Sequence, residues 1–309
     1  MGRLFFYIYQ EFRYICPTNI FSVANQIKDY LSLVKFSHTI FAMPFAVIGF
    51  MLGVAQPEQR FDGYLFILVL LCMVFARTAA MAFNRWADRH YDRQNDRTKI
   101  REIPSGVISS GSAAWLVVLS SLAFVGTTWF INSICFALSP IALIIVLGYS
   151  FTKRFTWLCH LVLGIGLSLA PIGAYLAVTG EFDWIPILFS MTVLTWVTGF
   201  DIIYALQDEE FDKSNELYSM PSIFGKKKAL KTSSFFHLMS IAFLALAGSL
   251  AGFGFTYWAG FTIFSALLVY QHTLVKPNDL TKVNIAFFTT NGIASIVFAA
   301  FVVTELIIR

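Results

Sequence analysis

Long apolar stretches decide what this chain can fold into. Nine segments of about 20 residues each are apolar enough to cross the hydrocarbon core of a membrane. They lie at 31–54, 62–83, 112–131, 133–151, 157–178, 184–205, 234–252, 255–274 and 284–307. Because a backbone in lipid must satisfy its hydrogen bonds internally, each stretch is predicted to be an α-helix. The predicted fold class is therefore an all-α polytopic membrane bundle of nine transmembrane helices.

The composition excludes soluble and disordered folds. Only 13% of the residues are charged, whereas soluble domains carry about 25%. Aromatic residues reach 17%, and disorder requires few aromatics and high charge. The four cysteines are widely spaced without a C-x-x-C pair, which indicates neither a disulfide framework nor a zinc site. We expect one transmembrane domain over 31–309, preceded by a cytoplasmic or interfacial extension at 1–30.

The basic residues predict the orientation in the membrane. With the N-terminus in the cytoplasm, 19 of the 22 Lys and Arg residues fall on the cytoplasmic side, in agreement with the positive-inside rule. The two long loops, roughly 84–111 and 206–233, are then both cytoplasmic. The net charge of +4 reflects these loops and is not evidence for a nucleic-acid partner.

Each long loop opens with a row of oxygen-bearing side chains. The first row is Asn84, Asp88 and Asp92, and the second is Asp201, Asp208 and Asp212. Spacings of four and seven residues place the members of each row on one face of a helix. Arg77 lies about two helical turns before the first row and extends the polar face into the membrane. Both rows are predicted to lie at the cytoplasmic side.

Rows of carboxylates that repel one another are usually held by divalent cations. Mg²⁺ prefers oxygen ligands and commonly binds through one or two carboxylates together with substrate phosphates. The rows therefore predict a diphosphate substrate bridged by Mg²⁺. The alternative is that the acids only balance the numerous loop arginines. Asp201 and Arg77 favour a function, because ionisable groups among apolar neighbours are costly.

At these residues the chain resembles the UbiA-type intramembrane aromatic prenyltransferases. The resemblance rests on N-x-x-x-D-x-x-x-D at 84–92, D-x-x-x-D at 208–212, and the Pro-Ser-Gly at 104–106. The run from Tyr149 to Trp157 is similar to the third cytoplasmic segment of that family. The segment from Gly199 to Tyr204 is most similar to the branch that prenylates a dihydroxynaphthoate in futalosine-type menaquinone synthesis. The 4-hydroxybenzoate enzymes of ubiquinone synthesis are near relatives.

The resemblance implies a polyprenyltransferase. Its substrates would be a polyprenyl diphosphate and a small aromatic acid, either 1,4-dihydroxy-6-naphthoate-like or 4-hydroxybenzoate. The carboxylates Asp88, Asp92, Asp208 and Asp212 would be catalytic and, with Asn84, would bind Mg²⁺. Arg77, Lys153 and Arg154 would bind the diphosphate, and Asp201 or Tyr204 would orient the aromatic substrate. The isoprenoid tail would lie in the bundle or in membrane lipid, and the enzyme in a bacterial inner membrane with its active site facing the cytoplasm.

The main alternative function is a transporter with intramembrane acidic residues. Transporter sites usually lie near the bilayer midplane, whereas these acids cluster at helix ends. Among weaker signals, His38 and His160 are interpreted as hydrogen-bonded packing residues. Asn284, Asn291, Thr289 and Thr290 form a polar stripe suited to bonds between helices. Lys226 to Lys228 are interpreted as an anchor for anionic lipid.

Overall fold

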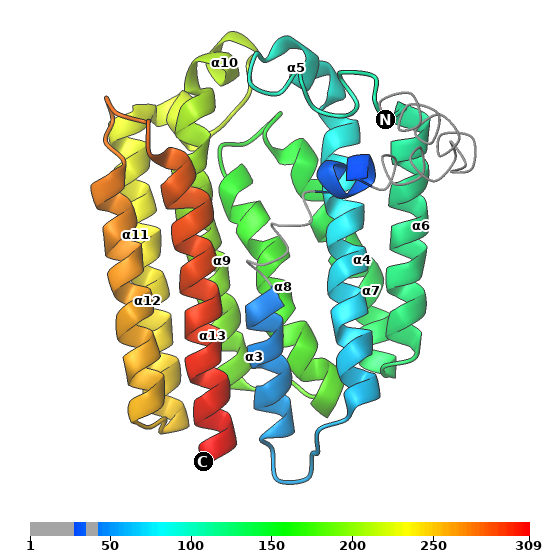
Figure 1. Cartoon of the computed structure of the whole chain (residues 1–309), viewed down its shortest axis with the longest axis vertical. Coiled ribbons are helices and arrows are strands. Elements are labelled where there is room, and N and C mark those ends of the chain that lie inside the picture. Colours follow the sequence, from blue (N-terminus) through cyan, green and yellow to red (C-terminus); the bar gives the residue numbers. More distant parts are fainter. Residues whose placement is uncertain (1–27, 35–42) are drawn as a thin grey trace, which may run out of the picture.

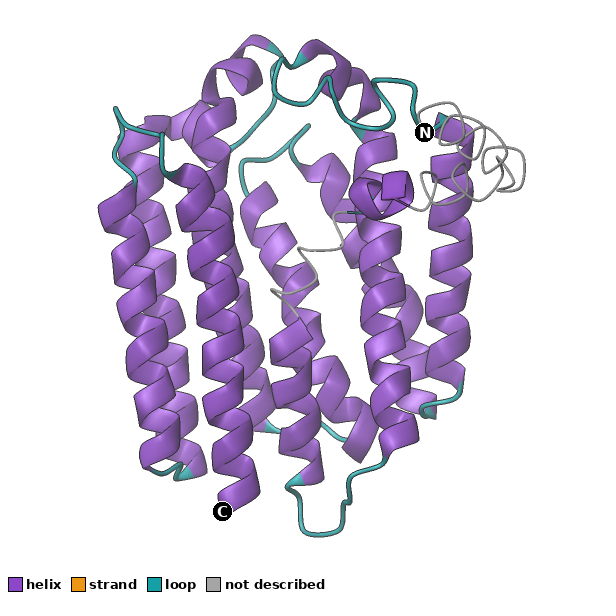
Figure 2. Ribbon diagram, viewed as in Figure 1, coloured by secondary structure: helices purple, strands orange, loops and turns teal. Residues whose placement is uncertain are grey.

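The structure is a computed structural model that describes residues 28–34 and 43–309, and in this part all regular elements are helices (Figures 1 and 2). The long elements are α3 (Met43–Val54), α4 (Gly63–Ala87), α6 (Ser110–Trp129), α7 (Ser133–Thr152), α8 (Cys159–Thr179), α9 (Trp184–Ala205), α11 (Met220–Ala251), α12 (Phe255–Leu274) and α13 (Asn291–Ile308). Two short helices, α5 (Arg89–Gln94) and α10 (Glu209–Ser214), lie at the end of the bundle opposite the C-terminus (Figure 1). A π-helical turn, η3 (Ile285–Thr290), leads into α13.

Seven helices in the described ranges are long and apolar enough to cross a membrane. These are α4, α6, α7, α8, α9, α11 and the unit of η3 with α13. The first predicted span, 31–54, is represented by the 12 residues of α3, next to residues outside the described part. The eighth corresponds to α12, which has the length of a span but includes Gln271 and His272. The structure thus supports seven of the nine predicted spans, and the count of nine and the cytoplasmic N-terminus remain predictions.

Polar side chains at the predicted loops fix where the helices begin. Asp62 Oδ1 accepts a hydrogen bond from the backbone N–H of Tyr64 (2.8 Å) at the start of α4. Asn132 caps α7 by accepting from the backbone N–H of Cys135 (2.9 Å). Its amide also donates to the carbonyl of Leu176 in α8 (2.8 Å). These bonds satisfy backbone groups that a helix end leaves free, so the loop between α6 and α7 needs only a short turn.

The tightest core surrounds α9. Trp196 of α9 is fully buried and its ring lies 5.3 Å from Phe45 of α3 and 5.7 Å from Phe264 of α12. Phe298 of α13 completes the cluster, 5.2 Å from Phe264. Buried aromatic pairs at such distances contribute about 0.5–1.5 kcal/mol each beyond the burial of their area. This cluster joins four helices that are far apart in the sequence.

Candidate active site

The first acidic row lies where α4 gives way to α5. α4 ends at Ala87, Asp88 has φ −91° and ψ 4°, and α5 begins at Arg89. Backbone bonds from Asp88 N to Asn84 O (2.9 Å) and from Asp92 N to Asp88 O (2.8 Å) carry the four-residue spacing across this bend. Asn84 Nδ2 donates to Asp88 Oδ2 (3.1 Å). The predicted spacing is retained, although two helices share the row.

The second row is not carried by the one continuous helix that the sequence predicts. α9 ends at Ala205, a 3₁₀ turn (η2, Leu206–Asp208) follows, and α10 begins at Glu209. A 3₁₀ turn has about 3.0 residues per turn, which rotates the residues after it away from the α-helical face. Asp201 is bonded to His160, whereas Asp208 is paired with Arg97 and Asp212 with Lys153.

Asp208 is held by the loop that follows the first row. Arg97 approaches both carboxylate oxygens, with Nη2 2.6 Å from Oδ2 and Nε 3.1 Å from Oδ1. Asn95 Nδ2 also donates to Oδ1 (3.3 Å). Arg97 donates through Nη1 to the hydroxyl of Tyr204 (3.0 Å), and Tyr204 stacks on Phe287 of η3 with the ring centres 4.2 Å apart. The two acidic segments are therefore in direct contact.

Two consecutive cations at the end of α7 join the rows a second time. Lys153 Nζ lies 2.7 Å from Asp212 Oδ1 in the second row. Arg154 Nη2 lies 3.3 Å from Asp88 Oδ1 in the first row and donates to the carbonyl of Ala87 (2.9 Å). Burial would lower the pKa of the Lys153 ammonium, but Asp212 and neighbouring acids together hold the pKa above its usual value. Burial raises the pKa of Asp88, although Arg154 acts in the opposite direction.

The donor set fits a hard divalent cation. Asp92 is buried; its Oδ1 accepts from Arg101 Nη1 (2.7 Å), while its buried Oδ2 has no hydrogen-bond partner in the described residues. Such an orphaned carboxylate oxygen is a ligand of the kind that Mg²⁺ prefers.

Within the described ranges the geometry brings no three His, Cys, Asp or Glu side chains together as a preformed metal cage. Each acid is instead paired with a cation, as the charge-balance interpretation expected.

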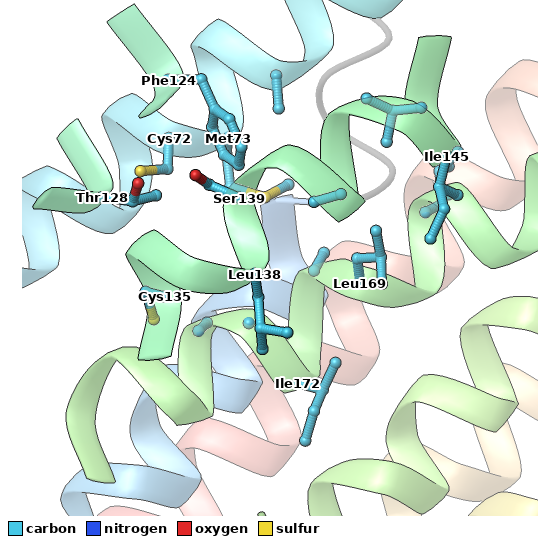
Figure 3. Close-up of a pocket in the computed structure, with 18 of the residues that line it drawn as sticks. Cys72, Met73, Phe124, Thr128, Cys135, Leu138, Ser139, Ile145, Leu169 and Ile172 are labelled. Carbon is cyan, nitrogen blue, oxygen red and sulfur yellow. The ribbon is translucent and has the colours of Figure 1, made fainter. Parts of the chain in front are cut away.

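An apolar cavity of about 410 Å³ lies between α4, α6, α7 and α8. Figure 3 shows Cys72, Phe124, Leu138 and Ile172 among its lining side chains. Arg77 and Tyr149, which also line it, come from the halves of α4 and α7 that are nearer in sequence to the acidic row at 84–92 and to Lys153. In the described part of the chain, the buried Nε of Arg77 has no hydrogen-bond partner. A charged group thus faces a cavity with hydrocarbon walls.

The predicted contacts for an aromatic substrate lie on one helix. Asp201 accepts through Oδ2 from Nδ1 of the buried His160 (2.7 Å), which confirms His160 as a hydrogen-bonded residue. Tyr204 is one turn further along α9 and is occupied by Arg97 and Phe287. Both Asp201 and Tyr204 lie in the last two turns of α9.

The weaker sequence signals separate into packing and surface residues. Asn291 is buried and its Oδ1 accepts from Trp196 Nε1 (2.9 Å), so it bonds between helices as predicted. Asn284 is exposed. Lys226 Nζ lies 3.6 Å from Glu209 Oε2, while Lys227 and Lys228 are exposed. His38 lies outside the described residues.

Sequence reasoning missed Asn95, Arg97 and Arg101. All three are in the first long loop, and the two arginines were used there only to assign orientation. Arg97 and Asp208 are 111 positions apart, so no spacing rule links them. One general rule could have pointed to these residues: a row of carboxylates needs nearby cations when no metal is bound.

The match to known proteins covers most of the chain. Residues 42–293 match the UbiA prenyltransferase family. The chain belongs to this family. A 4-hydroxybenzoate octaprenyltransferase of Francisella tularensis subsp. tularensis (strain WY96-3418) is 28% identical, over 78% of this chain and 83% of the relative. The protein of the same name from Alcanivorax borkumensis is 32% identical, over 63% of this chain and 67% of the relative.

Solved structures show the same fold. The apo UbiA homologue of Aeropyrum pernix K1 is 30% identical, with a TM-score of 0.79 over 87% of this chain and 98% of that one. A UbiA homologue of Archaeoglobus fulgidus, solved with GPP and Mg²⁺, is 23% identical, with a TM-score of 0.69 over 90% and 99%. The protein is thus a membrane-associated prenyltransferase, an enzyme of the transferase class, which decides against the transporter alternative.

Proposed function

We propose that this enzyme transfers a polyprenyl group from an allylic polyprenyl diphosphate to an aromatic quinone precursor. The acceptor would be 4-hydroxybenzoate or a 1,4-dihydroxy-6-naphthoate-like acid, in ubiquinone or menaquinone biosynthesis. The observation that carries the proposal is the placement of Lys153 on Asp212 and of Arg154 on Asp88. Consecutive cations thereby stand between two acidic rows, which is the charge pattern that a metal-bound diphosphate requires.

The roles follow from charge. Asn84, Asp88, Asp92, Asp208 and Asp212 would hold Mg²⁺, whose chemistry is to neutralise the leaving diphosphate. Arg77, Lys153 and Arg154 would contact the diphosphate and stabilise the charge that develops as the allylic carbon–oxygen bond breaks. The four aspartates would be catalytic in this sense, because they would hold the ion that neutralises the leaving diphosphate. The acceptor ring then attacks the allylic carbon and loses a proton.

The cavity gives the isoprenoid tail a place. Its walls are apolar, and Arg77 and Tyr149 lie at the end that leads to the acids. A tail anchored there by its diphosphate would extend between α4, α6, α7 and α8, where burial of each CH₂ contributes about 0.8 kcal/mol. The helices that line the cavity are candidate membrane spans, so the surrounding lipid would accommodate the rest of a longer tail.

Asp201 and Tyr204 would orient the acceptor. Asp201 uses only Oδ2 for His160, and its Oδ1 has no hydrogen bond in the described part of the chain. A phenolic hydroxyl is a suitable donor to that oxygen.

We also propose that residues 1–30 form an extension on the cytoplasmic side, and that the enzyme lies in a bacterial inner membrane with the site facing the cytoplasm.

The test is a transfer assay with the purified protein in lipid nanodiscs. Geranyl diphosphate and a longer polyprenyl diphosphate are each supplied with 4-hydroxybenzoate or 1,4-dihydroxy-6-naphthoate, with and without Mg²⁺. We expect a prenylated aromatic product and an equal amount of diphosphate, both dependent on Mg²⁺. Intact diphosphate substrate and no product with either acid would contradict the proposal.

A further inference from the structure

A buried histidine connects Asp201 to the beginning of α11. His160 lies in the first turn of α8 and is 3% exposed. The backbone N–H of Met220, the first residue of α11, donates to His160 Nε2 (3.3 Å). Because Nε2 is an acceptor, the imidazole proton is on Nδ1, and it is donated to Asp201 Oδ2 (2.7 Å). The protein thus fixes the tautomer of His160.

The same turn of α11 also contacts the second acidic row. Ser219, the N-cap of α11, donates through Oγ to Asp212 Oδ2 (2.8 Å). Asp212 is fully buried, and its other oxygen is paired with Lys153. The start of α11 is therefore bonded to Asp212 through Ser219 and to His160 through Met220.

Of the two carboxylate oxygens of Asp201, only Oδ2 has a hydrogen-bond partner among the described residues. The Asp201 side chain is 22% exposed, whereas that of His160 is 4% exposed. A carboxylate held at one oxygen by a buried donor has a defined orientation at the other. This is how outer partners orient the groups that touch a substrate or metal.

We propose that His160 is a positioning residue for the aromatic acceptor. By holding Oδ2 of Asp201, it aims Oδ1 at the phenolic hydroxyl and places the ring carbon beside the allylic carbon. The inference rests on the proposed function, in which Asp201 contacts the acceptor. His160 itself does not touch the substrate and accepts no proton in this role.

The test compares variants of His160 in the transfer assay. His160→Leu removes both hydrogen bonds, while His160→Gln keeps an amide donor and a carbonyl acceptor. We expect the Leu variant to lower kcat/KM for the acceptor about 10- to 100-fold, the usual effect of removing an outer partner. The KM for the prenyl diphosphate should stay within about two-fold, and the Gln variant should recover most of the loss. Ser168→Ala is the matched control, because Ser168 is a buried α8 side chain whose hydroxyl bonds within its own helix.

A double-mutant cycle separates positioning from packing. If His160 acts through Asp201, adding His160→Leu to Asp201→Ala should lower acceptor kcat/KM by less than about two-fold further. Equal losses of kcat/KM for both substrates, or full additivity in the cycle, would overturn the proposal. Should the Leu variant not fold, His160→Met, whose flexible apolar side chain also removes both hydrogen bonds, takes its place. Absence of product from the wild-type protein marks failure of the proposed function, whereas product formed equally by wild type and His160→Leu marks failure of this inference alone.

Discussion

Replacing Asp208 by Asn separates a metal-binding acid from one that only balances charge. The substitution keeps the size of the side chain and one acceptor oxygen, but it removes the carboxylate paired with Arg97 at 2.6 Å. The Arg97 side chain is 33% exposed, so water screens the charge left behind. We therefore expect the free energy of unfolding to fall by no more than about 1 kcal/mol.

The expected effect on catalysis is much larger. Loss of an electrostatic group that acts in the transition state lowers the rate about 10²–10³-fold, or about 3–4 kcal/mol. Asp88→Asn should have an effect of the same size, because Asp88 is also partly exposed and its bond to Arg154 is long (3.3 Å). If both acids hold metal on one diphosphate, the double variant should lose far less than the about 10⁴–10⁶-fold that independent effects would give.

The assay is prenyl transfer by purified single and double variants across a Mg²⁺ titration, with folding checked by thermal unfolding. Asp96→Asn is the matched control, since the Asp96 side chain lies in the same loop, is 95% exposed and, within the described ranges, pairs only with Lys99. Rates near wild type for Asp88→Asn or Asp208→Asn at every Mg²⁺ concentration would refute the metal assignment. A fall in stability that accounts for the whole loss of activity would do the same.

Three further predictions concern topology, the cavity and packing. In a cysteine-free background, Asp96→Cys should react with an impermeant reagent only from the cytoplasm and Glu181→Cys only from outside; labelling of both from one face would contradict the orientation. Gly173 lines the cavity and has open space at its Cβ position. Gly173→Phe should therefore raise the KM for a long polyprenyl diphosphate more than the KM for geranyl diphosphate. As the control, Gly126→Phe on the exposed face of α6 should change neither KM. In Gly49→Ala the new Cβ would meet a backbone carbonyl of α8 at 2.0 Å, so unfolding in detergent should show a loss of about 1–3 kcal/mol; unchanged stability would mean that the α3–α8 contact is looser than described.

Some of this structure follows from the sequence alone. The predicted spans 184–205 and 255–274 coincide with α9 and α12, because membrane thickness fixes the length of an apolar helix. The predicted span at 234–252 was too short, since α11 begins at Met220 with a capping box and bends at Gly225 (φ 76°). Its lysine-rich first turns lack an apolar signal, although lysine is compatible with a helix.

The sequence predicted which segments contain the candidate site, but not which of their side chains contact one another. Four-residue spacing placed Asn84 next to Asp88, and i→i+4 backbone bonds carry this spacing across the bend between α4 and α5. The spacing did not reveal the 3₁₀ turn that separates Asp201 in α9 from Asp212 in α10.

Local patterns of apolarity and charge specify the chemical types of the site residues and predict the side of the membrane on which they lie. The partners are not. Arg97 on Asp208, Lys153 on Asp212 and His160 on Asp201 join helices through side chains 41 to 111 positions apart. Such pairs, and the cavity between α4 and α8, depend on how rigid helices pack against one another. That arrangement is fixed by contacts such as the aromatic cluster around Trp196, which no local sequence rule specifies.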